Sequence, residues 1–249
     1  VGLFFVYLLH TTGELCISPV GLSMVTKLAP AHMTGVVMGA WFLSISMGNL
    51  VADAMVDRLS DQGITIAIQN GGGLRASIDA GTVTMGEVLT VLPFQNTLAS
   101  FQLKGSDVVA ALENGVSQVE EAAGRFPQVS GLKYTADLTK PAGSRITSVE
   151  VKEGDAFVAI DPNKVYGVAT NNYMRSGGDG YKVFATGGQN AYDFGPSLEQ
   201  VVADYLAANR PYTPKLDGRI TDATSYSIPI NPSVFIPEFP SLDKFPKTV

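Results

Sequence analysis

Charge is distributed very unevenly along this chain of 249 residues, and the unevenness restricts the folds open to it. Residues 1–52 contain only two charged side chains, Glu14 and Lys27, and every other charge of the protein follows them. Val1 to Thr26 and Met33 to Ala52 are long enough for membrane crossings, because a spanning helix needs about 20 mainly apolar residues. We therefore predict two apolar membrane-type helices. A signal peptide fits less well, because the segment lacks a basic start and a small-residue cleavage motif, and buried core helices are the other alternative.

Glu14 and Ser18 are the candidate functional residues of this apolar segment. Their i, i+4 spacing places them on one face of a helix, and a carboxylate at membrane depth is a functional candidate by default. The run YLLHTTGELCISPVGLSMVTKLAPAHMTGVVMGAWFLSISMGN (7–49) resembles the tenth and eleventh helices of proton-coupled oligopeptide transporters of the major facilitator superfamily. By that resemblance, Glu14 would hold the amino group of a peptide, with Ser18 beside it. Two helices cannot form an alternating-access pore, so this portion would transport nothing alone.

The overall composition excludes several classes of protein. A net charge of −6 and a pI of about 4.9 argue against a nucleic-acid partner, which would require a basic face. The single cysteine, Cys16, excludes a disulfide framework and a cysteine-rich zinc site. Only His10 and His32 carry imidazoles, so residues 53–249 have no histidine to offer a metal.

Beyond the apolar segment, strands alternate with helices without strict βαβ regularity, which predicts a mixed α/β (α+β) sheet domain. Apolar residues at helical spacing predict a helix over 48–62, and the apolar run 64–70 predicts a buried strand. Thr84 and Glu87 form a capping box that begins a short helix over 84–91. The other expected elements are strands in TLASFQLKG, LKYTAD, ITSVEVKEG, AFVAI and VYGVAT, a helix capped by Ser106, and an amphipathic helix over 198–210.

The first candidate site loop is Asn70-Gly71-Gly72-Gly73-Leu74-Arg75, which leaves the buried strand with three consecutive glycines. Such a loop can turn its N–H groups inward as an anion nest, and Arg75 can present a planar fork to phosphate or carboxylate. A Gly-rich turn with a surface arginine is the alternative. The loop is not a Walker P-loop, because no G-K-[ST] follows it.

Two further loops contribute aromatic residues. Phe94, in the loop 92–97, is either a core plug or an exposed stacking surface, and both interpretations stay open at this point. Tyr173 lies in 171–181, where we expect a strand to end in a flexible loop. If the two rings meet, they can sandwich a flat ring, an interaction worth about 1–3 kcal/mol per stacked base.

Taken in order, these motifs carry a second resemblance. The runs NGGGLRASI, VLPFQNTL, FQLKGSDVVAALENG, FPQVSGLKY and ATNNYMRSGGDGY resemble the C-terminal domain of 5′-nucleotidases from about Gly48 to Thr221. That family includes periplasmic UDP-sugar hydrolases and animal ecto-5′-nucleotidases. The resemblance implies that this domain binds the substrate, while a separate N-terminal calcineurin-like domain holds two divalent metals and cleaves the phosphate ester.

The same resemblance assigns residues to the nucleobase. Phe94 and Tyr173 match the two aromatic residues that clamp the base; the second is often Phe, and Tyr keeps the stacking face. Asn96 stands where some members use an asparagine to touch the base.

It also assigns residues to the sugar and the phosphate. Asn70 and Arg75 match residues that contact ribose and phosphate, and Asp179 matches the aspartate that hydrogen-bonds the ribose hydroxyls. The family usually has a further phosphate-directed arginine ahead of the first helix of the domain. Here Trp41 to Ser46 occupy that neighbourhood, so this contact is lost.

These observations predict three regions: transporter-like helices over 1–47, a 5′-nucleotidase C-terminal domain over 48–221, and a Pro-rich tail over 222–249. The expected function is that of a nucleotide-binding domain in nucleotide catabolism, without the metallophosphoesterase domain, catalytic residues, metal or cofactor. Whether the chain is an enzyme stays open. The alternatives are a fragment of a peptide:proton symporter and a membrane-anchored nucleoside-binding module without catalysis.

The expected partner is a nucleotide or nucleoside, with membrane contact through residues 1–52 and a periplasmic or cell-envelope location. The run Gly48 to Ala52 would be natural in either parent family. We therefore hypothesise that two unrelated reading frames were joined there, and a genuine fusion is the rival.

Overall fold

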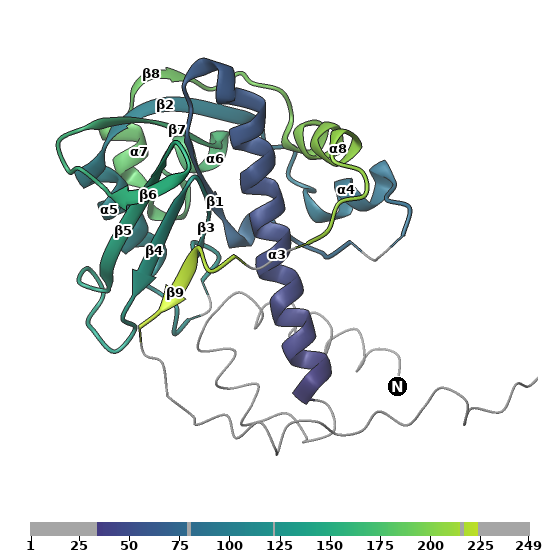
Figure 1. Cartoon of the computed structure of the whole chain (residues 1–249), viewed down its shortest axis with the longest axis horizontal. Helices are drawn as coiled ribbons and strands as arrows, with labels where there is room; N and C mark the ends of the chain where they lie inside the picture. Colours follow the sequence, from purple (N-terminus) through teal and green to yellow (C-terminus); the bar gives the residue numbers. More distant parts are fainter. Residues whose placement is uncertain (1–33, 79–80, 122, 215–216, 224–249) are drawn as a thin grey trace, which may run out of the picture.

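The long helix α3 (Thr34–Leu59) and two β-sheets organise the chain (Figure 1). The computed structural model describes residues 34–78, 81–121, 123–214 and 217–223. The candidate peptide-binding pair Glu14 and Ser18 lies outside the described residues, as does nearly all of the expected Pro-rich tail.

The larger sheet has five strands in the order β3-β1-β7-β2-β8. Strand β1 is parallel to β7, and the other neighbouring strands are antiparallel. Every residue of β1 is buried, which confirms the strand predicted from the apolar run 64–70. The strands are β1 (Ile66–Asn70), β2 (Leu98–Lys104), β3 (Pro127–Ser130), β7 (Val165–Asn171) and β8 (Gln189–Tyr192).

The smaller sheet has four strands in the order β6-β5-β4-β9. Its members are β4 (Leu132–Ala136), β5 (Ile146–Glu153), β6 (Ala156–Ala159) and β9 (Ile220–Asp222). Alternating burial along β4 confirms the period-2 pattern expected there, with Tyr134 among the inward residues.

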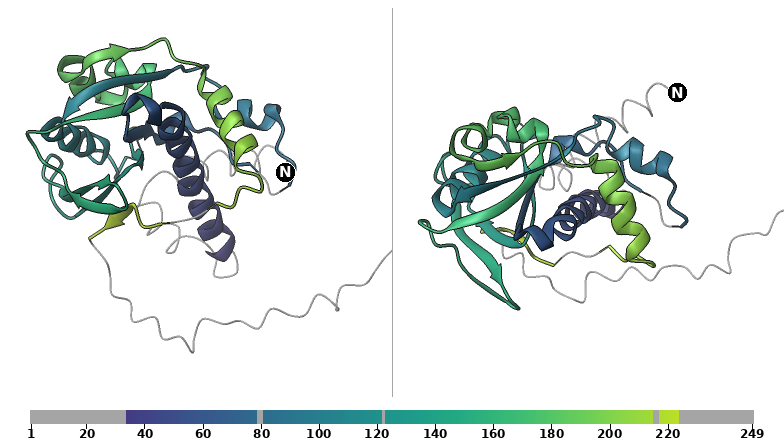
Figure 2. Two further views of the ribbon diagram at one scale, coloured as in Figure 1. Left: turned by 45° about the horizontal axis from the view of Figure 1, so that its top comes forward. Right: turned by 90° about the horizontal axis from the view of Figure 1, so that it is seen from above.

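Helices cover both faces of the larger sheet. Successive side chains of a strand point to opposite faces, so they belong to two different hydrophobic cores. Ile66 and Ile68 belong to one core with α5 and the small sheet, while Ala67 belongs to a second core with α3, α4 and α8. Both views in Figure 2 place α3 beside α8. The remaining helices are α4 (Met85–Val91), α5 (Gly105–Gly115), α6 (Asn172–Arg175), α7 (Lys182–Gly187) and α8 (Leu198–Ala208), with 3₁₀ turns η1 (Ser60–Gln62), η2 (Gly71–Gly73) and η3 (Gly178–Gly180).

The expected membrane-type helix over Met33 to Ala52 is wrong. Among the described residues, no helix combines the length and apolar character needed to cross a membrane. The segment instead continues without interruption to Leu59 as α3, and its later apolar residues serve the domain core. Val51 and Met55 are fully buried there, which accounts for the low charge of this part of the sequence. The first expected span, Val1 to Thr26, lies outside the described residues.

The predicted start of α4 is confirmed, because it depends only on hydrogen bonds between residues close in sequence. Thr84 caps α4 through a complete capping box, in which its hydroxyl accepts from the Glu87 N–H and the Glu87 carboxylate accepts from the Thr84 N–H. Ser106, by contrast, is not the cap of α5, because the N-cap position is Lys104. Strand β3 was not expected, since it is a four-residue edge strand that begins with a proline.

Candidate functional site

Three segments that are distant in sequence meet at one edge of the larger sheet. Because β1 and β7 are parallel, their carboxyl ends lie at the same edge, and antiparallel β2 begins there, with Leu98 opposite Asn171. The Thr97 N–H donates to the Asn172 side-chain oxygen at 3.1 Å, and the Asn172 N–H donates to the Thr97 carbonyl at 3.0 Å. The loops bearing Asn70, Phe94 and Tyr173 therefore converge at the edge where α/β sheets usually bind ligands.

Asp179 is the centre of the polar contacts at this edge. The Asn70 amide nitrogen donates to Asp179 Oδ2 at 2.6 Å, and the Tyr173 hydroxyl donates to Oδ1 at 2.9 Å. The Tyr173 hydroxyl also accepts the Asp179 N–H at 3.2 Å. Its hydrogen bond to the carboxylate is the main cause of a raised pKa at Tyr173. Three of the six predicted contact residues are thus brought together directly.

The segment that carries Asp179 contains short helices where we expected a loop: after β7 the chain forms α6, η3 and α7. Asp179 adopts a left-handed conformation with φ 51°, which L-residues rarely take. Gly180 follows with φ 80°, and a Cβ there would lie 2.7 Å from the Asn114 side-chain oxygen. The turn is therefore built around a glycine that no larger residue can replace without strain.

A second layer of side chains supports this turn from behind. The Asn114 amide nitrogen donates to the Asp179 carbonyl at 3.1 Å, and Asn114 Oδ1 accepts from the Arg125 guanidinium at 3.2 Å. Arg125 also donates to the Ser117 hydroxyl at 3.2 Å. The buried Tyr181 hydroxyl donates to the Arg125 carbonyl at 2.6 Å, and burial raises the pKa of this tyrosine. We did not anticipate Asn114 or Arg125 from the sequence, because no local pattern marks a contact that depends on folding.

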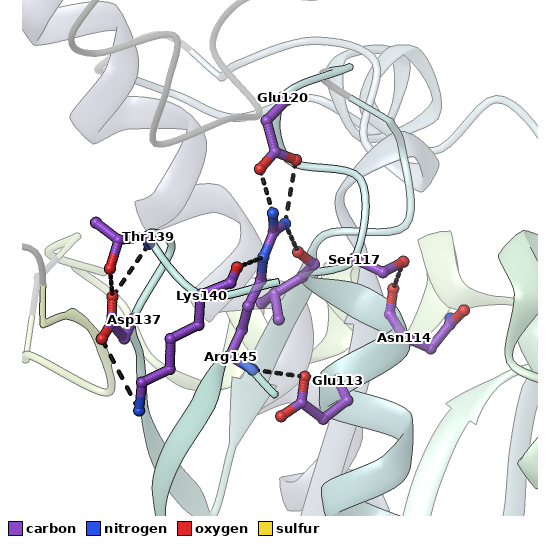
Figure 3. A network of polar contacts seen from close by, with 9 residues as sticks. Glu113, Asn114, Ser117, Glu120, Asp137, Thr139, Lys140 and Arg145 are labelled. Atoms are coloured by element: carbon purple, nitrogen blue, oxygen red, sulfur yellow. Dashed lines mark hydrogen bonds and ion pairs between the residues drawn. The ribbon is translucent and has the colours of Figure 1, made fainter. Parts of the chain in front are cut away.

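The end of α5, where Asn114 lies, is itself anchored by Arg145 (Figure 3). The Arg145 guanidinium donates to the Val116 carbonyl at 2.6 Å and pairs with Glu120. The Arg145 backbone N–H donates to the Glu113 carboxylate at 3.0 Å. The hydrogen bond from Arg145 lowers the pKa of Glu120. This network fixes the helix end from which Asn114 reaches the Asp179 turn.

Asn70 is held in place by neighbouring amides at the ends of β1 and β7. The Asn171 amide nitrogen donates to Asn70 Oδ1 and to Gln69 Oε1, both at 2.9 Å. Asn171 Oδ1 accepts the Met174 N–H at 2.8 Å as the N-cap of α6. Asn70 is only 4% exposed, and the hydrogen bond from Asn171 holds its side chain with the amide nitrogen directed at Asp179 Oδ2. We did not assign a role to Asn171 from the sequence. The signal that could have indicated one is that asparagine is a preferred N-cap residue.

The two candidate aromatic residues are both exposed. Phe94 is 56% and Tyr173 45% exposed, which excludes the interpretation of Phe94 as a core plug. Phe94 and Asn96 line one small pocket together with Gly73 and with Leu92 and Leu198. Exposed rings at this edge leave flat faces available for stacking.

The Gly-rich loop does not form an anion nest, which leaves the alternative interpretation, a Gly-rich turn with a surface arginine. The N–H groups of Gly71 and Gly72 donate to the Phe126 and Gly124 carbonyls at 2.8 and 2.7 Å. Those backbone donors are therefore already satisfied inside the protein. The Arg75 side chain is exposed and has no polar partner among the described residues, so the structure does not join it to the Asp179 group.

The arrangement combines an acceptor carboxylate with exposed aromatic faces at the carboxyl ends of the central strands. Such a combination suits a ligand that has a flat ring and hydroxyl donors. Within the described residues, no group of three or more His, Cys, Asp or Glu side chains could hold a metal ion. The structure is thus a mixed α/β domain with a candidate ligand site at the carboxyl ends of its central strands.

Comparison with known sequences supplies the family. The model of the family described as 5′-nucleotidase, C-terminal domain, matches residues 32–186, and the chain belongs to this family. The match begins ahead of residue 47, so it includes part of the segment that we assigned to transporter-like helices. The fold class expected for the domain is confirmed.

Relatives agree with this assignment. The chain is 42% identical over 181 residues to the trifunctional nucleotide phosphoesterase protein YfkN of Bacillus subtilis, covering 71% of this chain and 12% of that protein. It is 32% identical to the 5′-nucleotidase of Bos taurus, covering 76% and 35% of the two chains. The chain thus spans about a third or less of the length of these relatives.

Solved structures give the same result. The 5′-nucleotidase precursor from Thermus thermophilus has a TM-score of 0.70 and 46% identity, covering 72% of this chain and 36% of that chain. The NAD nucleotidase of Haemophilus influenzae has a TM-score of 0.65 and 31% identity, covering 71% and 32%.

Proposed function

We propose that this chain supplies the nucleotide-binding domain of a 5′-nucleotidase acting in nucleotide catabolism. The observation that carries the proposal is the Asp179 carboxylate beside the exposed Tyr173 ring, at the sheet edge where the Phe94 loop also ends. In this proposal the base stacks between Phe94 and Tyr173, Asn96 touches the base, and Asp179 accepts hydrogen bonds from the ribose.

In the same proposal Arg75 binds the phosphate of the ligand, and Asn70 contacts the sugar. An exposed guanidinium that has no polar partner within the described part of the chain can form a bidentate contact to phosphate, and its five donors suit that group better than an ammonium. Asn70 keeps Asp179 in place through its amide, so it acts at the sugar both by contact and by positioning.

We assign to this chain the binding of nucleotide. Family resemblance implies two divalent metals in a separate N-terminal domain, and the described residues hold no ligand cluster that fits them. Binding, orientation of the base and recognition of the sugar are the steps that these residues support. We further propose a periplasmic or cell-envelope location and a nucleotide-binding unit that ends near Thr221, within the strand β9.

Calorimetric titration of the full chain with AMP tests the proposal. Replacing Phe94 or Tyr173 with alanine removes a stacking partner worth about 1–3 kcal/mol, so we expect each variant to weaken binding by about fivefold to a hundredfold. Phe157→Ala on β6 of the other sheet is the matched control and should bind as the wild type does. Unchanged affinity in both site variants would remove the clamp assignment.

A further inference from the structure

The Tyr173 hydroxyl forms a closed pair of hydrogen bonds with a single residue. It donates to Asp179 Oδ1 at 2.9 Å and accepts the N–H of the same residue at 3.2 Å. A phenylalanine would present the same stacking face and neither of these bonds. The hydroxyl therefore does something at this site that base stacking does not require.

The ring of Tyr173 lies against the turn that it hydrogen-bonds. A Cβ at Gly178 would lie 2.5 Å from the ring carbons of Tyr173, so the glycine leaves room for the ring. Contact with Gly178 together with the two bonds to Asp179 sets the position of the hydroxyl. To uncover Oδ1, the ring that forms one side of the proposed clamp would have to move.

The other carboxylate oxygen of Asp179 also has a partner. Asn70 donates to Oδ2 at 2.6 Å, and Asn70 is itself buried and held by Asn171. Each carboxylate oxygen of Asp179 thus accepts a hydrogen bond from a side-chain donor. Asp179 is half-buried, which limits the directions from which a further donor can approach.

We propose that the Tyr173 hydroxyl competes with the ligand sugar for Asp179, so that this site accepts ribonucleotides and 2′-deoxyribonucleotides with similar affinity. The proposal rests on the nucleotide-binding function given above. A ribose hydroxyl that bonds Oδ1 replaces the tyrosine donor, so one hydrogen bond is exchanged for another. With the tyrosine hydroxyl removed, the same ribose hydroxyl would form a charge-assisted bond that displaces only water.

The test compares AMP with 2′-deoxy-AMP and 3′-deoxy-AMP, by calorimetric titration of the wild-type chain and of Tyr173→Phe. We expect the wild type to bind the three ligands within about threefold of one another, and Tyr173→Phe to prefer AMP by about tenfold over at least one deoxy ligand, the effect of one hydrogen bond to a charged group. Tyr192→Phe is the matched control, because the exposed Tyr192 hydroxyl bonds only the Phe194 carbonyl in the described structure. This control should keep the wild-type ratios.

The outcomes distinguish failure of this inference from failure of the proposed function. If the wild type already prefers AMP by tenfold, or if Tyr173→Phe leaves the ratios unchanged, the hydroxyl does not compete and the inference is wrong. In both cases the proposed function still holds, provided that AMP binds and Phe94→Ala weakens its binding. If AMP does not bind the wild type, the proposed function fails and the inference fails with it. A tenfold preference of the wild type for AMP would overturn the inference without any variant, and thermal unfolding establishes that the Tyr173→Phe protein is folded before its ratios are compared.

Discussion

Replacing Asn114 with alanine tests whether the layer behind Asp179 positions the site. The change removes the donor to the Asp179 carbonyl and one of the two side-chain acceptors of Arg125, at 3.1 and 3.2 Å. Asp179 holds an unfavourable left-handed backbone, for which strain of about 1–3 kcal/mol is typical, so the turn depends on such supports. One neutral hydrogen bond contributes about 1 kcal/mol net.

We therefore expect Asn114→Ala to weaken AMP binding by about fivefold, which corresponds to about 1 kcal/mol. Calorimetric titration measures the affinity, and thermal unfolding establishes that the domain is intact. Ser117→Ala is the control, because it removes the other acceptor of Arg125 and leaves the bond to Asp179 in place. Equal effects of the two substitutions, or an unchanged affinity in a folded Asn114→Ala protein, would refute the positioning role.

Two further predictions concern stability. Asp53→Ala should lower the free energy of unfolding by about 2–3 kcal/mol in urea titration, because it leaves the largely buried Arg219 with Asp217 as its remaining carboxylate; breaking a fully buried pair costs about 3–5 kcal/mol. A loss below about 0.5 kcal/mol, the range of ordinary surface changes, would contradict this. The hydrogen bond from Arg219 lowers the pKa of Asp217 from 3.8, so its contribution is present above that pH and is lost as the pH falls through the lower folded pKa. The difference in urea midpoint between wild type and Asp217→Asn should therefore be constant above about pH 5 and shrink below pH 3.8; a difference independent of pH would be the contrary result.

The elements that local forces define were predictable from the sequence. The run 64–70 became β1 because a continuous apolar stretch of that length suits a strand buried on both faces. Thr84 began α4 because a capping box is complete within four residues. The apolar content of Met33 to Ala52 led to the wrong prediction of a membrane helix, because burial in lipid and burial in a protein core select the same residue types. Only the packing of α3 against the sheet and α8 separates these two environments.

For the candidate site, the sequence by itself determined which residues stand near the strand ends, since Asn70 and Tyr173 come within a few positions of hydrophobic runs. Tertiary structure decided what those residues touch. Asn70 bonds Asp179 across 109 positions and Asn114 reaches the same turn across 65, distances that no local pattern encodes. The engagement of the Asp179 carboxylate by Tyr173 likewise exists only because the turn folds back over the ring. Hydrogen-bond partners depend on ångström-scale placement, which the parallel pairing of β1 with β7 provides and residue order does not.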